Sequence, residues 1–355
     1  MSTEPDFAVP TGDYLSEWMD DNDVIAAELG RRLGASRKHV SELLSGKAPL
    51  SRSVAIALEE VTGIPARIWN QYEALYREDL ARLEANVAFA AQHEKAKAYP
   101  LAYLRKFGFI EAAASDRSGT VRQLLSLFGV ASVDALRTTW SEGSVAYRRA
   151  VVTREDAPAV ATWLALGERA AEHRDLAAFD KGALKAMLPG LRALSGADPT
   201  TYVAECVNSL AQVGVALCFV PPMPGLGVYG ATRWVQGRPI VQLSLRYKTD
   251  DQLWFTLFHE IGHILLHGES GLYLTDDASI AEEEADRFAS DELIPPRFAM
   301  RLPRRRDITA IRLLAEELGI APGIVLGRVQ HEMGDYAWGN DLKSRFEFVV
   351  EGVAS

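Results

Sequence analysis

The sequence predicts a mainly α protein with an α+β C-terminal domain that contains a small sheet. Up to about residue 205, Ala- and Leu-rich stretches such as "TVRQLLSLFGV" have apolar residues at helical spacing. The composition changes near Gly214, where "GVALCFV" and "RPIVQLSLR" are rich in β-branched residues typical of strands. The length of 355 residues is sufficient for two or three domains.

Composition and charge exclude several classes of protein. With 48% hydrophobic and 24% charged residues the chain is expected to fold rather than remain disordered. Its net charge is −10, so any contact with DNA must come from a local basic surface. No apolar run approaches the ~18 residues that span a membrane, and the acidic N-terminus lacks the apolar core of a signal peptide. Because Cys206 and Cys218 are the only cysteines, we expect a reducing, cytoplasmic location.

The stretch "NDVIAAELGRRLGASRKHVSELLSGK" predicts two helices joined by a tight turn. Gly34 marks the turn and Ser36 is placed to cap the second helix. Two apolar stripes would form the core of this unit. One consists of Val24, Ile25, Leu29 and Leu33, and the other of Val40, Leu43 and Leu44. These features favour an N-terminal helix-turn-helix bundle.

Basic residues are concentrated on the second of these helices and just beyond it. Residues 31–52 hold six Lys or Arg and one acid, whereas residues 1–28 hold eight acids and no Lys or Arg. In a helix-turn-helix the start of the second helix meets base edges, usually in a dimer on a palindromic operator. The candidate DNA contacts are Ser36, Arg37, Lys38, His39, Ser41, Lys47 and Arg52. The alternative is an ordinary helical bundle with a solvated basic face.

One motif in the strand region is rejected. Gly225 to Gly230, "GLGVYG", fits the G-x-G-x-x-G pattern of dinucleotide sites, which requires a helix directly afterwards. The next residues, "ATRWVQGRPIVQL", instead predict the two strands of a hairpin. We interpret residues 239–245 as an edge strand able to pair with an extended substrate.

The stretch "LFHEIGHILLHG", residues 257–268, predicts a helix that carries a metal site. His259 and His263 are four positions apart and therefore share one face of a helix. Two imidazoles at this spacing converge on Zn²⁺ at about 2.0–2.1 Å, with Glu260 beside the open coordination position. His267 continues the series, either toward the site or as a residue of the last turn.

A return helix from about 280 to 292, within "SIAEEEADRFASDELIPP", supplies the third ligand. Catalytic zinc commonly takes three protein ligands plus water. Glu282 and Asp286 are again four apart, so Glu282 is assigned to the metal and Asp286 to the N–H of a histidine ligand. The neighbouring Glu283 and Glu284 remain alternatives for the ligand.

Capping patterns accompany both helices. Thr249 and Gln252 form a Thr-x-x-Gln capping box before the motif helix, and Gly268 is placed as its left-handed stop. Ser279 and Glu282 also form a capping-box pattern, which would explain Glu282 without any metal.

The runs "LRYKTDDQLWFTLFHEIGHILLHG", "EEEADRFASDELIPP" and "LGIAPGIVLGRVQHE" resemble ImmA/IrrE-like metallopeptidases over roughly residues 150–335. The resemblance implies a zincin-like fold. It implies that His259, His263 and Glu282 are the zinc ligands and that Glu260 is the catalytic base. Asp286 then stands at the family's Asn/Asp position. "ELGRRLGASRKHVSELLSGK" resembles the Xre-type helix-turn-helix, and "IALEEVTGIPARIWNQYEALY" is similar to the tail of HigA-like antidotes.

Together these features predict a DNA-binding transcriptional regulator with a zinc-dependent endopeptidase domain that cleaves a repressor or antitoxin. Zinc would lower the pKa of water toward ~7, and Glu260 would take its proton as the water attacks a peptide carbonyl. The donor to the oxyanion remains open among Arg246, Tyr247 and His331. The alternative is a HigA-like antidote or repressor whose metal domain senses or binds a partner, such as a toxin, without significant proteolysis.

The expected segments follow from these motifs. They are a loose N-terminus at 1–12, a helix-turn-helix domain at 13–80, a helical connecting region at 81–149, a metallopeptidase domain at 150–335 and a tail at 336–355.

Overall fold

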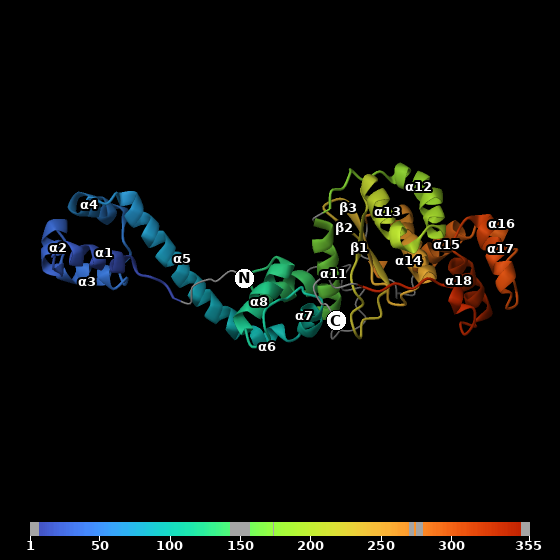
Figure 1. Cartoon of the computed structure of the whole chain (residues 1–355), viewed down its shortest axis with the longest axis horizontal. Helices are drawn as coiled ribbons and strands as arrows, with labels where there is room; N and C mark the ends of the chain where they lie inside the picture. Colours follow the sequence, from blue (N-terminus) through green and yellow to red (C-terminus); the bar gives the residue numbers. More distant parts are fainter. Residues whose placement is uncertain (1–6, 143–156, 173, 270–272, 275–279, 349–355) are drawn as a thin grey trace. The chain divides into compact units, whose positions relative to one another are not determined.

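A computed structural model describes residues 7–142, 157–172, 174–269, 273–274 and 280–348. The chain is mainly helical with a four-stranded sheet in its C-terminal part, which confirms the predicted fold class. It divides into two compact units, residues 1–93 with 113–122 and residues 94–112 with 123–355. Figure 1 shows the elements of both units. None of the described helices is long and apolar enough to cross a membrane.

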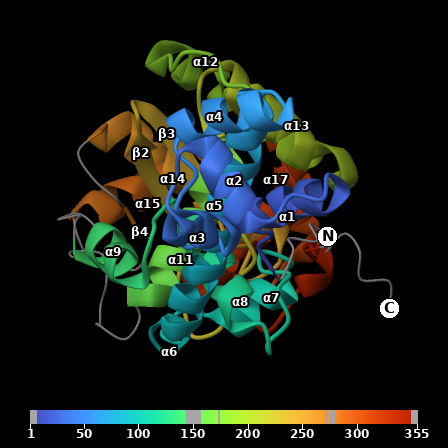
Figure 2. The same ribbon diagram turned by 90° about the vertical axis from the view of Figure 1, so that its left-hand side faces the viewer.

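The first unit contains a bundle of four helices followed by a longer helix (Figures 1 and 2). The helices are α1 (Thr11–Asp21), α2 (Ala26–Leu33), α3 (Arg37–Leu44), α4 (Arg52–Thr62) and α5 (Ala66–Ala91). Leu29, Val40 and Trp69 are fully buried in its core. The domain boundary expected after residue 80 lies inside α5, because no Gly or Pro interrupts this helix.

The predicted helix, turn and helix are formed by α2 and α3. Gly34 adopts the left-handed conformation, with φ 63° and ψ 26°. The Ser36 hydroxyl accepts the backbone N–H of His39 at 3.2 Å, which confirms the predicted cap. Ile25 was wrongly placed in the apolar stripe: it precedes the first turn of α2 in an extended conformation, and its side chain is 69% exposed.

Helices continue through the next part of the chain. They are α6 (His93–Ala96), α7 (Leu101–Lys106), α8 (Arg117–Phe128), α9 (Val133–Leu136) and the π-helix η1 (Arg137–Glu142), followed by α11 (Ala157–Glu172), α12 (Lys181–Ala193), the 3-10 turn η2 (Leu194–Gly196) and α13 (Pro199–Gln212).

The sheet of the second unit has the order β1-β3-β2-β4. Its strands are β1 (Ala216–Phe219), β2 (Gly230–Val235), β3 (Arg238–Leu243) and β4 (Tyr273–Leu274). Strands β2 and β3 form the predicted antiparallel hairpin, and β1 runs parallel to β3. The interpretation of residues 239–245 as an edge strand is wrong, since β3 is hydrogen-bonded on both sides. Strand β2 follows "GLGVYG", where a nucleotide-binding motif would require a helix, so the rejection of that motif is confirmed.

Helices cover both faces of the sheet (Figure 1). Helix α11 packs against one face, where Cys218 is fully buried as expected of a core residue. The other face packs against α13 and α14 (Asp250–His267), and Val241 lies in the large core between them. Helix α14 is therefore enclosed, and its motif residues lie in the interior of the unit.

The C-terminal elements complete the surroundings of α14. They are α15 (Ile280–Leu293), α16 (Pro296–Ala299), α17 (Ile308–Leu318), α18 (Pro322–Met333) and the 3-10 turn η3 (Asn340–Leu342). Helix α15 lies very close to α14 at Gly262, where a Cβ atom would be 3.0 Å from the Phe288 ring and 3.3 Å from the Cα of Ala285. The chain then returns to the start of α14, where Phe346 donates its N–H to the carbonyl of Lys248 at 2.8 Å.

Candidate metal centre

The ends of α14 differ in detail from the sequence prediction. Thr249 occupies the N-cap position, but its hydroxyl makes no capping bond, so the predicted capping box does not form. The N–H of Asp251 is bound instead by the Asp250 carboxylate at 2.9 Å. Gly268 has a positive φ of 64°, but its ψ of −146° extends the chain rather than curling it back in the left-handed conformation. Ser279, the alternative cap, lies outside the described residues.

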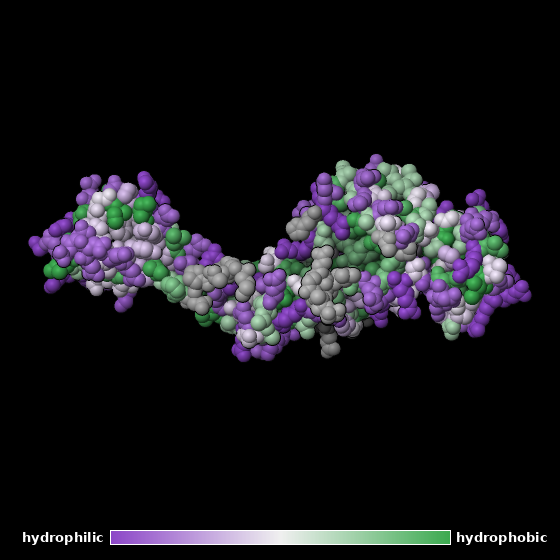
Figure 3. Space-filling model, viewed as in Figure 1, coloured by the Kyte–Doolittle hydropathy of each residue, from purple (hydrophilic) through white to green (hydrophobic). Residues whose placement is uncertain are grey.

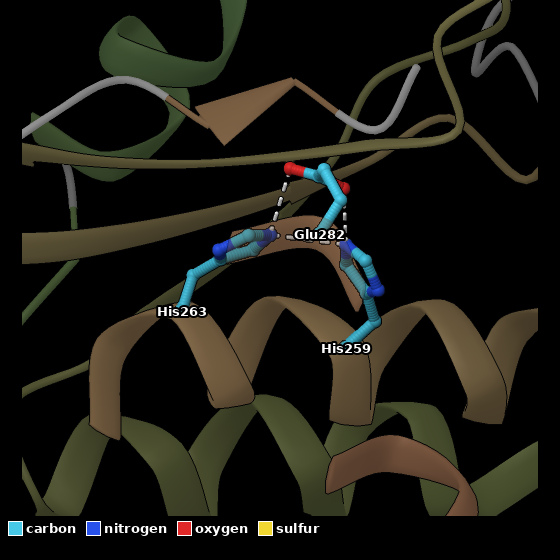
Figure 4. A group of neighbouring side chains, drawn as sticks. All are labelled: His259, His263 and Glu282. Carbon is cyan, nitrogen blue, oxygen red and sulfur yellow. Dashed lines mark hydrogen bonds and ion pairs between the residues drawn. The ribbon is translucent and has the colours of Figure 1, made fainter. Parts of the chain in front are cut away.

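Three of the predicted residues converge on one point. His259 and His263 project from α14, and the carboxylate of Glu282 on α15 faces both of their Nε2 atoms (Figure 4). The two Nε2 atoms are 3.0 Å apart. Glu282 Oε2 lies 2.9 Å from His259 Nε2, and its Oε1 lies 3.2 Å from His263 Nε2. Of the three neighbouring glutamates, Glu282 is the one that reaches both rings.

This donor set fits a zinc ion. Ligands at about 2.0–2.1 Å in a tetrahedral site are separated by roughly 3.3 Å, close to the separations of these three groups. Their potential ligand atoms all lie within 4.8 Å of one another. Both histidine side chains are fully buried, and that of Glu282 is only 12% exposed. Two imidazoles and a carboxylate leave a fourth position for water or substrate, as catalytic zinc requires.

Burial and hydrogen bonding at the site shift the pKa values of His259 and Glu282 in opposite directions. Burial alone would lower the pKa of His259, but hydrogen bonds to Asp286 and Glu282 raise that pKa to about 10. Burial would raise the pKa of Glu282, but the two histidines lower it to about 2. A cation that binds at these atoms must therefore compete with protons for the histidine nitrogens.

Each candidate histidine ligand has a partner behind its ring. Asp286 Oδ1 lies 2.8 Å from His259 Nδ1, as expected for a residue that accepts this N–H. His263 Nδ1 lies 3.0 Å from Nδ1 of His267, the last residue of α14. The second ring nitrogen of His267 lies 3.0 Å from the Glu284 carboxylate. With Nε2 of each ligand reserved for the metal, these contacts hold each ring by its other nitrogen.

We expect His267→Ala and Asp286→Asn each to weaken zinc binding by about tenfold to a hundredfold, because each removes a group that orients a ligand ring. Chelator competition measures the dissociation constant. Glu283 is exposed and next to this network, so Glu283→Gln is the matched control and is expected to bind zinc like the wild type. Equal zinc affinity in all four proteins would show that these partners do not orient the ligands.

Glu260 follows His259 on α14, and its carboxylate contacts strand β2. Its carboxylate Oε2 accepts a hydrogen bond from the Thr232 hydroxyl at 2.7 Å, and its side chain is fully buried. Gly230 leaves room for it, since a Cβ atom there would lie 2.3 Å from Oε1 of Glu260. The carboxylate is thus held in one position between α14 and the sheet, next to the histidine ligands.

A cavity of about 490 Å³ opens beside His259. Tyr247 and His331, two of the three candidate oxyanion donors, line it. Arg246 does not line it, and its guanidinium donates to the carbonyl of Leu226 at 3.2 Å. Two of the three candidates therefore line the same cavity as His259.

Three contributors at the site were not assigned a role there from the sequence. The sequence left open whether His267 approaches the site or only ends the helix. It is the last residue of α14 and also contacts His263. Its four-residue spacing from His263 was the available signal. Thr232 and Gly230 carried no signal, because only the folded sheet brings them against a glutamate that is 28 positions from Thr232.

Comparison with known families agrees with this geometry. Residues 212–330 match the family model described as the IrrE N-terminal-like domain of the M78 peptidases. This stretch carries a metallopeptidase-type domain. It contains the complete three-residue group and lies inside the range expected from the resemblance, and it does not extend to the N-terminal bundle. No curated protein was found to match the chain.

Proposed function

We propose that this chain is a zinc-dependent endopeptidase that cleaves a protein partner and also binds operator DNA. The observation that carries the peptidase half is the buried group of two histidines and one glutamate beside a second, separately held carboxylate. A structural zinc site needs no such second carboxylate, whereas hydrolysis needs a group that accepts a proton. A repressor or an antitoxin is the proposed class of substrate.

The residues of the site have distinct tasks in this proposal. Zinc held by His259, His263 and Glu282 would polarise the scissile carbonyl and acidify water at neutral pH. Glu260 accepts the proton of the attacking water and passes it to the leaving amine. The hydrogen bond from Thr232 keeps the Glu260 carboxylate in place during both transfers.

The charge that develops on the carbonyl oxygen needs a further donor. Tyr247 and His331 line the cavity beside His259, so they are better placed than Arg246 to supply it. The Tyr247 hydroxyl lies 3.0 Å from that of Tyr229, and His331 Nδ1 lies 3.2 Å from the Tyr336 hydroxyl. These partners restrict the orientation of both candidate donors.

The direct test is to incubate zinc-loaded protein with candidate repressors or antitoxins encoded near it and to look for defined cleavage products. Zinc-dependent cleavage at one peptide bond is expected. Zinc retention with no cleavage of any partner, but with stable complex formation, would instead favour the alternative of a HigA-like antidote or repressor. Its metal domain would then sense or bind its partner.

The surface of α3 supports the DNA-binding half. Arg37, Lys38 and Ser41 are exposed on it, with Lys47 and Arg52 exposed just beyond. The visible face of the bundle is mostly hydrophilic in Figure 3. Lys38 pairs with Glu42 at 3.7 Å, whereas Arg37, Lys47 and Arg52 have no ion pair within the described part of the chain. These side chains are available to phosphates and base edges without breaking internal bonds.

We expect Arg37→Ala to weaken operator binding by ~1–3 kcal/mol and to relax the preference at one base pair, as loss of a bidentate arginine–guanine contact does. Lys38→Ala is expected to weaken it less, since its ammonium is shared with Glu42. Titration of the protein against its own promoter measures both. Binding is expected to be that of a homodimer on half-sites about one helical turn apart.

Arg67→Ala is the matched control, because Arg67 is also exposed but lies on α5 outside the helix-turn-helix. Unaltered affinity in both α3 variants would remove this helix from the interface. No binding to any selected sequence would make the N-terminal bundle a protein-interaction module.

A further inference from the structure

The cavity beside His259 has a mixed lining that the proposed reaction does not explain. Its walls come from α14, α15 and α18 and are largely apolar, with Phe255, Leu293, Ile294 and Ile324 among them. Its volume of about 490 Å³ is within the range of small-ligand sites and leaves room for a large side chain. The rest of the lining is polar or aromatic.

The cavity is placed next to the reacting groups. His259 itself forms part of its wall. Thr256 and Tyr229 line it as well. Both lie near Glu260, because Tyr229 precedes Gly230, and a Cβ atom on Gly230 would be 2.8 Å from Thr256 and 2.3 Å from Glu260. A side chain adjacent to a peptide bond placed between His259 and Glu260 can therefore enter this cavity.

One buried acceptor in the lining lacks a partner. The Asp251 side chain is only 5% exposed, and its Oδ2 pairs with Lys343 at 2.7 Å. Its Oδ1 has no hydrogen-bond partner among the described residues. Gly327, which faces it, makes the space, since a Cβ there would lie 2.6 Å from Oδ2. A buried carboxylate oxygen without a donor is costly, so a ligand that supplies one gains affinity.

The aromatic lining of the cavity favours a flat ligand. Tyr229 and Tyr247 stack at 5.2 Å between ring centroids, with an angle of 18° between their planes. A cationic side chain is disfavoured, because Lys343 already neutralises Asp251 and Arg328 also lines the cavity. The occupant that fits both the apolar walls and the unpartnered oxygen has an aromatic body with a hydrogen-bond donor at its tip.

We propose that this cavity selects the substrate by binding a tyrosine or tryptophan side chain next to the scissile bond. This inference rests on the proposed function, because it names the residue that the peptidase would recognise. The aromatic ring fills the space between Phe255 and Ile324, and its O–H or N–H donates to Asp251 Oδ1. The cleaved partner must then expose such a residue in an extended or locally unfolded segment.

The test measures binding of N-acetyl amino-acid hydroxamates, which bind zinc through the hydroxamate group, to the zinc-loaded protein by calorimetry. We expect the tyrosine compound to bind about tenfold or more tightly than the alanine compound. The phenylalanine compound is expected in between, about fivefold weaker than tyrosine, because it has no donor for Asp251. The lysine compound is expected to gain nothing over alanine.

Ser290→Phe places a ring inside the cavity from α15, and Asp291→Phe places the same ring on the exposed neighbouring position outside it. Only Ser290→Phe is expected to reduce the affinity for the tyrosine compound to that for the alanine compound. Unchanged zinc content and unchanged alanine binding show that the variant is folded. Equal affinities of all four compounds for the wild type would overturn the cavity inference and leave the zinc centre intact.

If zinc is bound but no hydroxamate binds, the proposed open metal centre fails instead. The cavity inference is then tested by measuring the binding of p-cresol and of toluene to the metal-free protein. Tighter binding of p-cresol, lost in Ser290→Phe but not in Asp291→Phe, supports the inference. No difference between the two probes, or no binding of either, overturns it.

Discussion

Glu260→Gln is expected to leave the zinc content unchanged and to lower the rate of substrate cleavage by about 10²- to 10⁴-fold. The amide has the shape of the carboxylate, and its oxygen can still accept the hydrogen bond from Thr232, so the fold is retained. It cannot take a proton from water. The rate of product formation from an identified partner, followed beside zinc analysis, measures the effect.

Glu283→Gln is the control for this variant, since it removes a carboxylate from the same region at an exposed position. It is expected to cleave at the wild-type rate. A Glu260→Gln protein that cuts its substrate as fast as the wild type would show that Glu260 is not the base, whatever the metal does.

His263→Ala is expected to reduce bound zinc from about one ion per chain to almost none, because only two ligands remain on opposite helices. Glu282→Ala is expected to do the same. The loss should also reduce the thermal stability that zinc confers on the wild type, because a ligand that binds only the folded state stabilises it. Elemental analysis after removal of loosely bound metal measures the stoichiometry.

The matched control is His331→Ala, which removes an exposed histidine from the cavity without touching the three ligands. Its zinc content is expected to match that of the wild type. Undiminished zinc in His263→Ala would reject this histidine as a ligand.

The ligand geometry was predictable because helical periodicity is local. Residues four apart share a face, which brought His259 next to His263 and set Asp286 on the same side as Glu282. The sequence alone favoured Glu282 but left Glu283 and Glu284 as alternatives. Only the packing of α15 on α14 at Gly262 shows that Glu282 is the one that reaches both rings.

Features that depend on distant parts of the chain were not predictable. The β2–β3 hairpin followed from local composition, but the inner position of β3 depends on its pairing with β1 across 18 intervening residues. The capping box at Thr249 failed because a neighbouring carboxylate satisfies the backbone instead. The cavity beside His259 needs α18, which no local pattern places next to α14.

The most direct measurement of the metal centre is anomalous X-ray scattering at the zinc edge from crystals of the zinc-loaded protein. We expect one anomalous peak within about 2.0–2.2 Å of Nε2 of His259, Nε2 of His263 and the carboxylate of Glu282. A peak bound by other residues, or no peak at this centre in crystals that contain stoichiometric zinc, would contradict this expectation.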